Sequence, residues 1–122
     1  MTIFFYDSYA IIEYLKNNPA FISYFEEHSG VLSIFTLTEV YYSVLSEEGE
    51  TKANEVLEML YLLVIDTRKE TIQKAMKFRF FHKKRKFSYA DSIGYALAQE
   101  RGISFLTGDQ QFKDILGVAF VR

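Results

Sequence analysis

Four consecutive apolar residues, Ile3 to Tyr6, run directly into Asp7 near the start of the chain. A strand with one face in water alternates apolar and polar side chains. This segment does not alternate, which is typical of a strand buried on both faces of a parallel sheet. Short apolar runs and segments of helical spacing then follow one another, as in α/β proteins. We therefore expect one α/β domain over residues 1–122, with a mostly parallel central sheet of four to five strands and helices on both faces.

Periodicity and turn residues give the approximate bounds of the elements. Helices are expected over about 8–16, 19–28, 36–45, 51–61, 69–84 and 89–101, with a brief helical turn near 110–112. Strands are expected over about 2–6, 31–35, 62–65, 104–106 and 118–121. Ligands of parallel sheets bind beyond the carboxyl ends of the strands, near the point where strand order reverses. Acidic residues at those ends are therefore the first candidates for a functional site.

The residue types limit the chemistry that the chain can perform. The sequence has no cysteine, and its two histidines, His28 and His82, are far apart. Thiolate metal sites are therefore excluded, and a histidine-rich zinc site is not expected. A bound metal would be held mainly by oxygen, which indicates magnesium, manganese or calcium. No Gly-x-x-x-x-Gly-Lys phosphate loop is present, which argues against a nucleotide hydrolase.

Charge is divided unevenly along the chain. Residues 1–66 contain eleven acidic residues and two lysines, whereas residues 67–122 contain twelve Lys or Arg and five acidic residues. Such polarity predicts a basic surface for a polyanion or an acidic partner. No apolar run reaches the length of a membrane-spanning helix, and the first residues do not resemble a signal peptide. We expect a cytoplasmic protein with no membrane partner.

Three aspartates occupy the junctions at which strands end or helices begin: Asp7, Asp91 and Asp109. Each has a structural interpretation, because Asp is favoured as a helix N-cap and Ser88 with Asp91 has the spacing of a capping box. The helix after Asp91 is apolar almost all round, so this carboxylate is expected at the sheltered start of a buried helix. Two carboxylates about 5 Å apart repel by roughly 3 kcal/mol, which a divalent cation would offset and a cap would not. Clustering of the three favours a metal site, and separation favours caps.

Four segments, taken in order, resemble the PIN domain family, and specifically its VapC-type toxins from toxin–antitoxin pairs. They are Asp7-Ser8 followed by an apolar helix, the segment 36–40 (TLTEV), the segment 91–98 (DSIGYALA) followed by Gly102, and the segment 107–112 (TGDQQF). The resemblance spans nearly the whole chain. Tyr9 departs from the pattern, because the family has a small polar residue there.

The resemblance implies an endoribonuclease that binds one or two Mg²⁺ or Mn²⁺ ions and is blocked by a cognate antitoxin. It implies the metal ligands Asp7, Glu39, Asp91 and Asp109, with supporting hydroxyls on Ser8 and Thr107. Glu39 is assigned by resemblance alone, since it lies opposite the apolar stripe of its helix and the local pattern predicts a surface residue.

Bases and aromatics interleave over residues 79–87. This segment is expected to contact RNA phosphates and unpaired bases or, as a second use, the antitoxin. The cations concerned are Arg79, Lys83, Lys84, Arg85 and Lys86. A structural alternative is a cation-rich helix end whose phenylalanines lie in the core.

Two other functions stay open at this point. A catalytically degenerate PIN-like module that only binds proteins is favoured by the bulk of Tyr9. A receiver-type phosphoacceptor domain also places acids at strand ends, and Asp66 ends an expected strand, but Asp7 lacks the acidic neighbour of receivers. Aromatic-rich helices such as the one around Tyr41 and Tyr42 are consistent with a homodimer.

Overall fold

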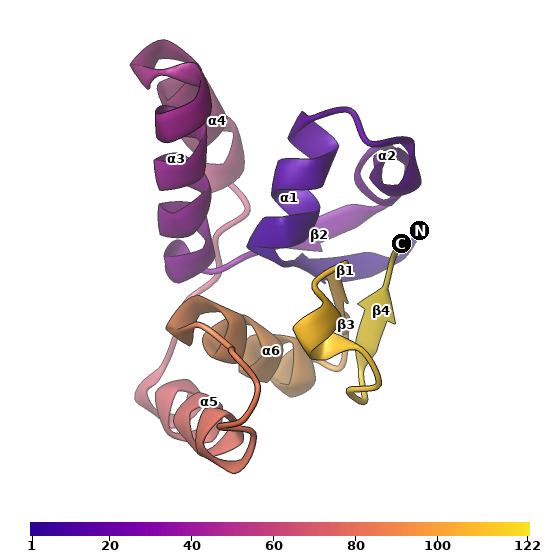
Figure 1. The fold of residues 1–122 in the computed structure, drawn as a ribbon, viewed down its shortest axis with the longest axis vertical. Helices are drawn as coiled ribbons and strands as arrows, with labels where there is room; N and C mark the ends of the chain where they lie inside the picture. The colour runs from indigo at the N-terminus through magenta and orange to yellow at the C-terminus, as the bar shows by residue number, and fades with distance from the viewer.

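The computed structural model describes all residues from 1 to 122 and contains one four-stranded sheet in which every pairing is parallel. Its strands, in the spatial order β2-β1-β3-β4, are β2 (Ser29–Val31), β1 (Ile3–Tyr6), β3 (Ser104–Thr107) and β4 (Val118–Phe120). Figure 1 shows the sheet beside helices from both halves of the chain. The expected α/β class and parallel sheet are confirmed.

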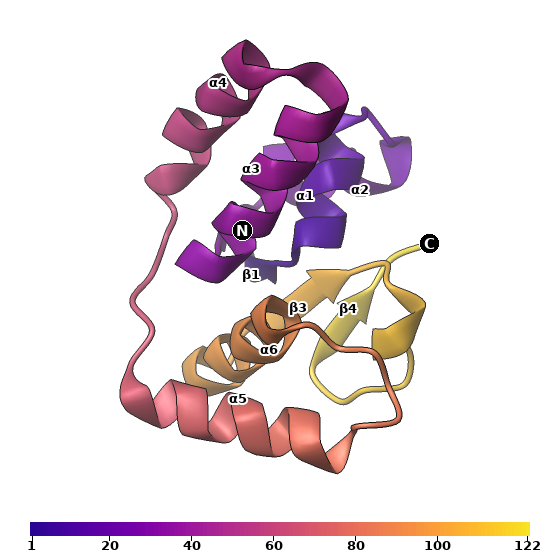
Figure 2. The ribbon, with the colours of Figure 1, turned by 60° about the vertical axis from the view of Figure 1, so that its left-hand side comes forward.

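Six α-helices and one short 3₁₀ helix complete the fold. They are α1 (Ser8–Leu15), α2 (Pro19–Glu26), α3 (Ile34–Glu48), α4 (Glu50–Tyr61), α5 (Lys69–Phe81), α6 (Tyr89–Arg101) and η1 (Gln110–Phe112). Helices α3 and α4 form one hairpin, and α5 packs along α6 (Figure 2). No helix combines the length and the apolar character needed to cross a membrane.

Strand β1 is covered on both faces, as its unbroken apolar sequence predicts. Phe5 faces α6, where a Cβ built on Gly94 would lie 2.6 Å from the Phe5 ring. Tyr6 faces the opposite side, where its ring stacks on Phe25 of α2 at a centroid distance of 4.0 Å and its hydroxyl donates to the Tyr24 carbonyl. Successive side chains of a strand point to opposite faces, so one apolar strand supports two helical layers.

Two expected strands differ from the structure. Residues 62–65 form no strand and make only an isolated bridge between Val64 and Leu32, because the backbone turns at the end of α4, where the Leu63 amide donates to the Leu60 carbonyl at 2.9 Å. The strand expected over 31–35 instead ends at Val31. The Ser33 side chain accepts a hydrogen bond from the Thr36 amide, and this N-cap starts α3 two residues after β2. The N-cap at Ser33 therefore ends the strand, although the apolar residues continue to Phe35.

The strand order reverses beside β1, and this point positions the site. The chain passes from β1 to β2 on one side, whereas β3 pairs with β1 on the other side in the register Tyr6 to Leu106. The residues that follow these two strands therefore emerge together at one edge. Ligands of open parallel sheets bind at such a switch point.

Candidate metal centre

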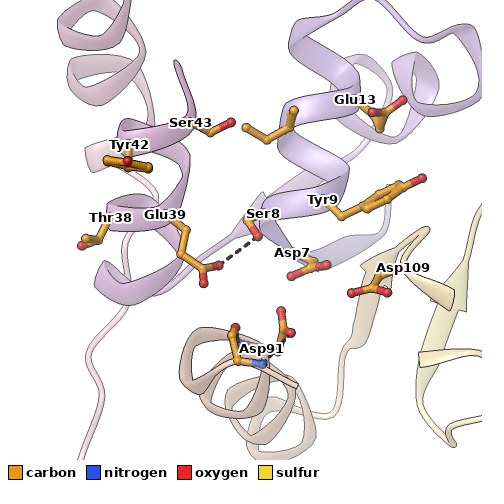
Figure 3. A pocket seen from close by; sticks show the side chains of 12 residues that line it. Asp7, Ser8, Tyr9, Glu13, Thr38, Glu39, Tyr42, Ser43, Asp91 and Asp109 are labelled. Carbon is orange, nitrogen blue, oxygen red and sulfur yellow. Dashed lines mark hydrogen bonds between the residues drawn. The ribbon is translucent and has the colours of Figure 1, made fainter. Parts of the chain in front are cut away.

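A cavity of about 720 Å³ lies at this edge of the sheet. The segment after β1, the helices α1 and α3, the start of α6 and the segment after β3 all contribute to its lining (Figure 3). Five acidic residues line it: Asp7, Glu13, Glu39, Asp91 and Asp109. Glu13 was not among the residues selected from the sequence, and its carboxylate accepts a hydrogen bond from the Asn18 side chain at 2.8 Å.

Asp7 is buried, with 4% of its surface exposed, and its side chain does not cap the helix that it precedes. Its Oδ2 instead accepts a hydrogen bond of 2.6 Å from the hydroxyl of Thr107, the last residue of the neighbouring strand β3. Asp7 therefore occupies the N-cap position of α1 but does not make the side-chain capping bond that the structural interpretation requires. The carboxylate is held against the end of β3 and lines the cavity.

Asp91 forms the capping box that its spacing predicts. Its Oδ2 accepts from the Ser88 amide at 2.9 Å, and its own amide donates to the Ser88 hydroxyl at 3.0 Å. The nine residues from Ala90 to Ala98 are all buried, as expected for a helix without a polar face. Because the carboxylate also lines the cavity, capping and a role in the site are not exclusive alternatives.

Thr107 links Asp7 to Asp109. Its hydroxyl donates to Asp7 and accepts from the Asp109 amide at 3.0 Å. Asp109 caps η1 through a hydrogen bond from the Gln111 amide to its Oδ1 at 3.0 Å. The hydroxyl that the resemblance marked as supporting therefore contacts the aspartates from two neighbouring strand ends.

Glu39 is half-buried and lines the cavity from α3. Its Oε1 accepts a hydrogen bond of 3.1 Å from the Ser8 hydroxyl on α1 (Figure 3). The prediction of a solvated surface residue, made from helical periodicity, is therefore wrong. The face of α3 opposite its own apolar stripe is partly covered because α1 packs against α3.

The electrostatics of the cavity disfavour ionised carboxylates. Burial, then the charge of Asp91, raise the pKa of Asp7 well above its ordinary value, while the hydrogen bond from Thr107 acts in the opposite direction. Burial likewise raises the pKa of Asp91 to about 6, with hydrogen bonds from Ser88 opposing the rise and the charges of Glu39 and Asp109 adding to it. No Lys or Arg lines the cavity, and buried carboxylates without a cationic partner are costly.

The donor set fits a hard divalent cation, because its members are all carboxylates and hydroxyls. As the side chains stand, no three of them converge closely enough to hold one ion. The acidic residues therefore line one cavity without forming a complete coordination sphere.

Two arginines of the basic segment 79–87 make hydrogen bonds to the rest of the fold. Arg85 donates through one nitrogen to the carbonyls of Gln111 at 2.6 Å and Lys113 at 3.1 Å, and so ties the segment to the turn after Asp109. Arg79 donates to the Phe87 carbonyl at 3.0 Å, and the Phe87 ring is in the core. These bonds anchor the segment to the fold.

The remaining part of the segment faces solvent. Lys83, Lys84 and Lys86 are exposed, as are the rings of Phe80 and Phe81. The structural interpretation thus applies to Arg79 and Arg85, and only the exposed residues of the segment are available to a polyanion.

The two features that favoured other functions lie as follows. Asp66, the candidate phosphoacceptor, is exposed and does not line the cavity. Tyr9 lies in the cavity wall, with its ring centroid 6.2 Å from that of Phe21. Its ring occupies space that Gly108 leaves, since a Cβ on Gly108 would lie 2.6 Å from it.

Two solved structures share the fold. A chain of a toxin–antitoxin complex from Klebsiella pneumoniae superposes with a TM-score of 0.72 at 19% identity, covering 97% of this chain and 95% of that one. VapC20 of Mycobacterium tuberculosis, described as a sarcin–ricin loop cleaving toxin, superposes with a TM-score of 0.80 at 16% identity, covering 96% of this chain and 97% of that one. No curated protein matches the sequence.

The model of the PIN domain family matches residues 4–117. This range contains all four sequence segments that resemble the family and every acidic residue of the cavity. The chain therefore belongs to the PIN domain family.

Proposed function

We propose that this protein is a metal-dependent endoribonuclease and the toxin of a type II toxin–antitoxin pair. One observation carries the proposal: Asp7, Glu39, Asp91 and Asp109 come from four separate segments, line one cavity, and have no Lys or Arg among them. Such an arrangement raises the energy of the metal-free protein and favours a bound divalent cation.

The proposed chemistry is hydrolysis of a phosphodiester. Asp7, Glu39, Asp91 and Asp109 would hold a Mg²⁺ or Mn²⁺ ion, and such an ion would supply activation of water and stabilisation of charge at phosphorus. The Thr107 hydroxyl orients Asp7, and the Ser8 hydroxyl orients Glu39. The capping box fixes Asp91 at the start of α6. Supporting hydrogen bonds of this kind tune metal affinity.

The substrate and the partner are parts of the proposal. One similar structure is described as a toxin that cleaves the sarcin–ricin loop, and another comes from a toxin–antitoxin complex. We extend RNA cleavage and an antitoxin partner to this chain on that basis. The homodimeric state and the cytoplasmic location are proposed from the sequence alone. The exposed lysines Lys83, Lys84 and Lys86 supply the positive charge that an RNA backbone or an acidic antitoxin segment requires.

Cleavage assays with matched variants test the proposal. Purified protein is incubated with mixed RNAs in Mn²⁺, Mg²⁺ or EDTA, alongside Asp7→Asn, Asp91→Asn and Asp66→Asn. We expect metal-dependent cleavage that falls by about 100-fold or more in the first two variants. Asp66→Asn, a carboxylate lost outside the cavity, is expected to cleave like the wild type.

Other outcomes would separate the alternatives. Cleavage that survives both cavity substitutions would place the active site elsewhere and overturn the proposal. Absence of cleavage with every metal, combined with tight binding of a co-expressed antitoxin, would identify a protein-binding module. Incorporation of phosphate at Asp66 from an acyl phosphate would identify a phosphoacceptor.

A further inference from the structure

Two exposed aromatic rings stand in the wall of the acidic cavity. Only three of its twelve lining residues are apolar: Tyr9, Ile12 and Tyr42. Tyr9 is 40% exposed and Tyr42 is 71% exposed. In the view of Figure 3, Tyr42 lies on one side of Glu39 and Asp7, and Tyr9 lies on the other. In this view Glu39 and Asp7 thus lie between two rings contributed by different helices.

Hydrogen bonding within the protein does not explain the positions of these rings. The hydroxyl of neither tyrosine makes a hydrogen bond within the protein, whereas the neighbouring Tyr41 donates to Asn54 at 2.7 Å. Tyr42 lies one helical turn after Glu39 on α3, so its ring shares the face that carries the carboxylate. Exposed apolar surface concentrated at a cavity marks a binding site more often than scattered apolar residues do.

Tyr9 is held in a fixed position. Its ring packs near Phe21 and over Gly108. A Cβ built on Gly108 would lie only 2.6 Å from the Tyr9 ring. A ring supported on one side and exposed on the other loses little freedom on binding a flat ligand. Tyr89, a third exposed tyrosine beside the cavity residue Ser88, differs because the Arg79 guanidinium already lies over its ring at 4.7 Å.

We propose that Tyr9 and Tyr42 are positioning residues that stack on unpaired nucleobases on the two sides of the scissile phosphate. The inference rests on the proposed ribonuclease function and adds to it two residues, outside the set of carboxylates, that would hold the nucleotides on either side of the cut. Bases inside an A-form duplex are stacked on each other and do not reach side chains, whereas bases of loops and single strands do.

Stacking on these two rings does not distinguish one base from another. Stacking on aromatic rings tolerates every base, because each has a π-face. The cavity lining otherwise consists of acidic residues and hydroxyls in addition to Ile12. Selection at these two positions therefore acts on the unpaired state of the RNA and not on the identity of the base.

Kinetics of variants at Tyr42 test the inference. Loss of one base–aromatic stack in Tyr42→Ala is expected to raise KM for a single-stranded RNA by about 5- to 150-fold, with kcat close to the wild-type value. Tyr42→Phe keeps the ring and is expected to restore KM. Tyr61→Ala is the matched control, because Tyr61 is also exposed on a helix but lines a separate groove between α3 and α4.

The results separate this inference from the proposed function. Wild-type cleavage with an unchanged KM in Tyr42→Ala would overturn the stacking inference and leave the ribonuclease standing. Equal cleavage of a fully paired RNA and of an unpaired loop would do the same. Failure of the wild type to cleave any RNA would overturn both.

Photo-crosslinking supplies a measurement that does not depend on turnover. RNA containing 5-iodouridine, which crosslinks to stacked aromatic residues, is irradiated with the protein, and the modified peptides are mapped by mass spectrometry. Crosslinks at Tyr9 and Tyr42 support the inference. Crosslinks confined to the exposed Phe80 and Phe81 at the end of α5 would contradict it.

Discussion

Replacing Asp91 with asparagine should stabilise the metal-free protein at neutral pH. The Asp91 side chain is buried in a cavity that holds carboxylates and no cation, and its pKa is raised to about 6. An asparagine oxygen can still accept the hydrogen bond from the Ser88 amide, so the capping box survives. The substitution therefore removes a disfavoured charge without removing a cap.

The shift in the pKa of Asp91 gives the magnitude and the sign of its effect on the free energy of unfolding. In the unfolded chain the Asp91 carboxyl titrates at its ordinary value of 3.8, and in the folded protein at about 6. Between these values the folded state binds the proton and the unfolded state does not, so wild-type stability falls as pH rises through this window. The full deficit is roughly 3 kcal/mol above pH 6, and it vanishes below the ordinary value.

Urea denaturation in EDTA measures the difference at pH 7.5 and pH 4. Asp91→Asn should exceed the wild type at pH 7.5 by up to about 3 kcal/mol and at pH 4, just above the ordinary pKa, by only about 0.5 kcal/mol. Asp91→Ala serves as a control that also loses the capping bond, which contributes about 1 kcal/mol. Added Mn²⁺ should reverse the order at about 1,000 times its Kd, where a ligand stabilises the wild type by about 4.1 kcal/mol, more than the deficit of about 3 kcal/mol.

Two outcomes would refute this reasoning. An Asp91→Asn variant that is no more stable than the wild type at pH 7.5 would mean that burial does not penalise the charge. A gain of equal size at both pH values would mean that the stabilisation comes from packing or hydrogen bonding and not from ionisation.

Two further substitutions test the fold away from the cavity. Gly94→Ala places a methyl group 2.6 Å from the ring of Phe5 in the core, so chemical denaturation should show a loss of about 1–3 kcal/mol despite the better helix propensity of alanine; an unchanged stability would contradict the close contact. Glu100 is partly buried, which raises its pKa, but hydrogen bonds from Thr71 and Lys74 outweigh this and lower it. Glu100→Gln should therefore reduce stability at pH 7 and not at pH 2, where both states of the wild type are protonated, and a deficit that is the same at both pH values would rule out the charge as its source.

The elements that the sequence predicted well are those whose own residues determine them. Strand β1 is apolar at every position and is buried on both faces, and α6 begins and ends where its capping box and Gly102 indicate. The prediction of a strand over 62–65 was wrong, because a strand also needs a neighbouring strand to pair with, and the segment's own residues do not determine whether one is present. Beyond an isolated bridge, no neighbouring strand pairs with it.

The site was less predictable for a related reason. Helical spacing reports which side of a helix is apolar, but Glu39 is half-buried because another helix, α1, covers the opposite side. Tyr42 could not be distinguished from its neighbour Tyr41 by composition. Only the structure shows that Tyr41 packs and bonds to Asn54 while Tyr42 faces the cavity. The metal-binding role of the four carboxylates remains a prediction.

The hydrogen bond between Thr107 and Asp7 has a consequence for the timing of activity during synthesis. It joins residues 100 positions apart, and β1 lacks its neighbour β3 until that late segment has been made. A nascent chain that has exposed Asp7, Glu39 and Asp91 at the ribosome therefore still lacks the strand that orients Asp7 and carries Asp109. The proposed RNA-cleaving activity would therefore be absent until Asp109, the last acidic residue of the cavity, has emerged and β3 has paired with β1.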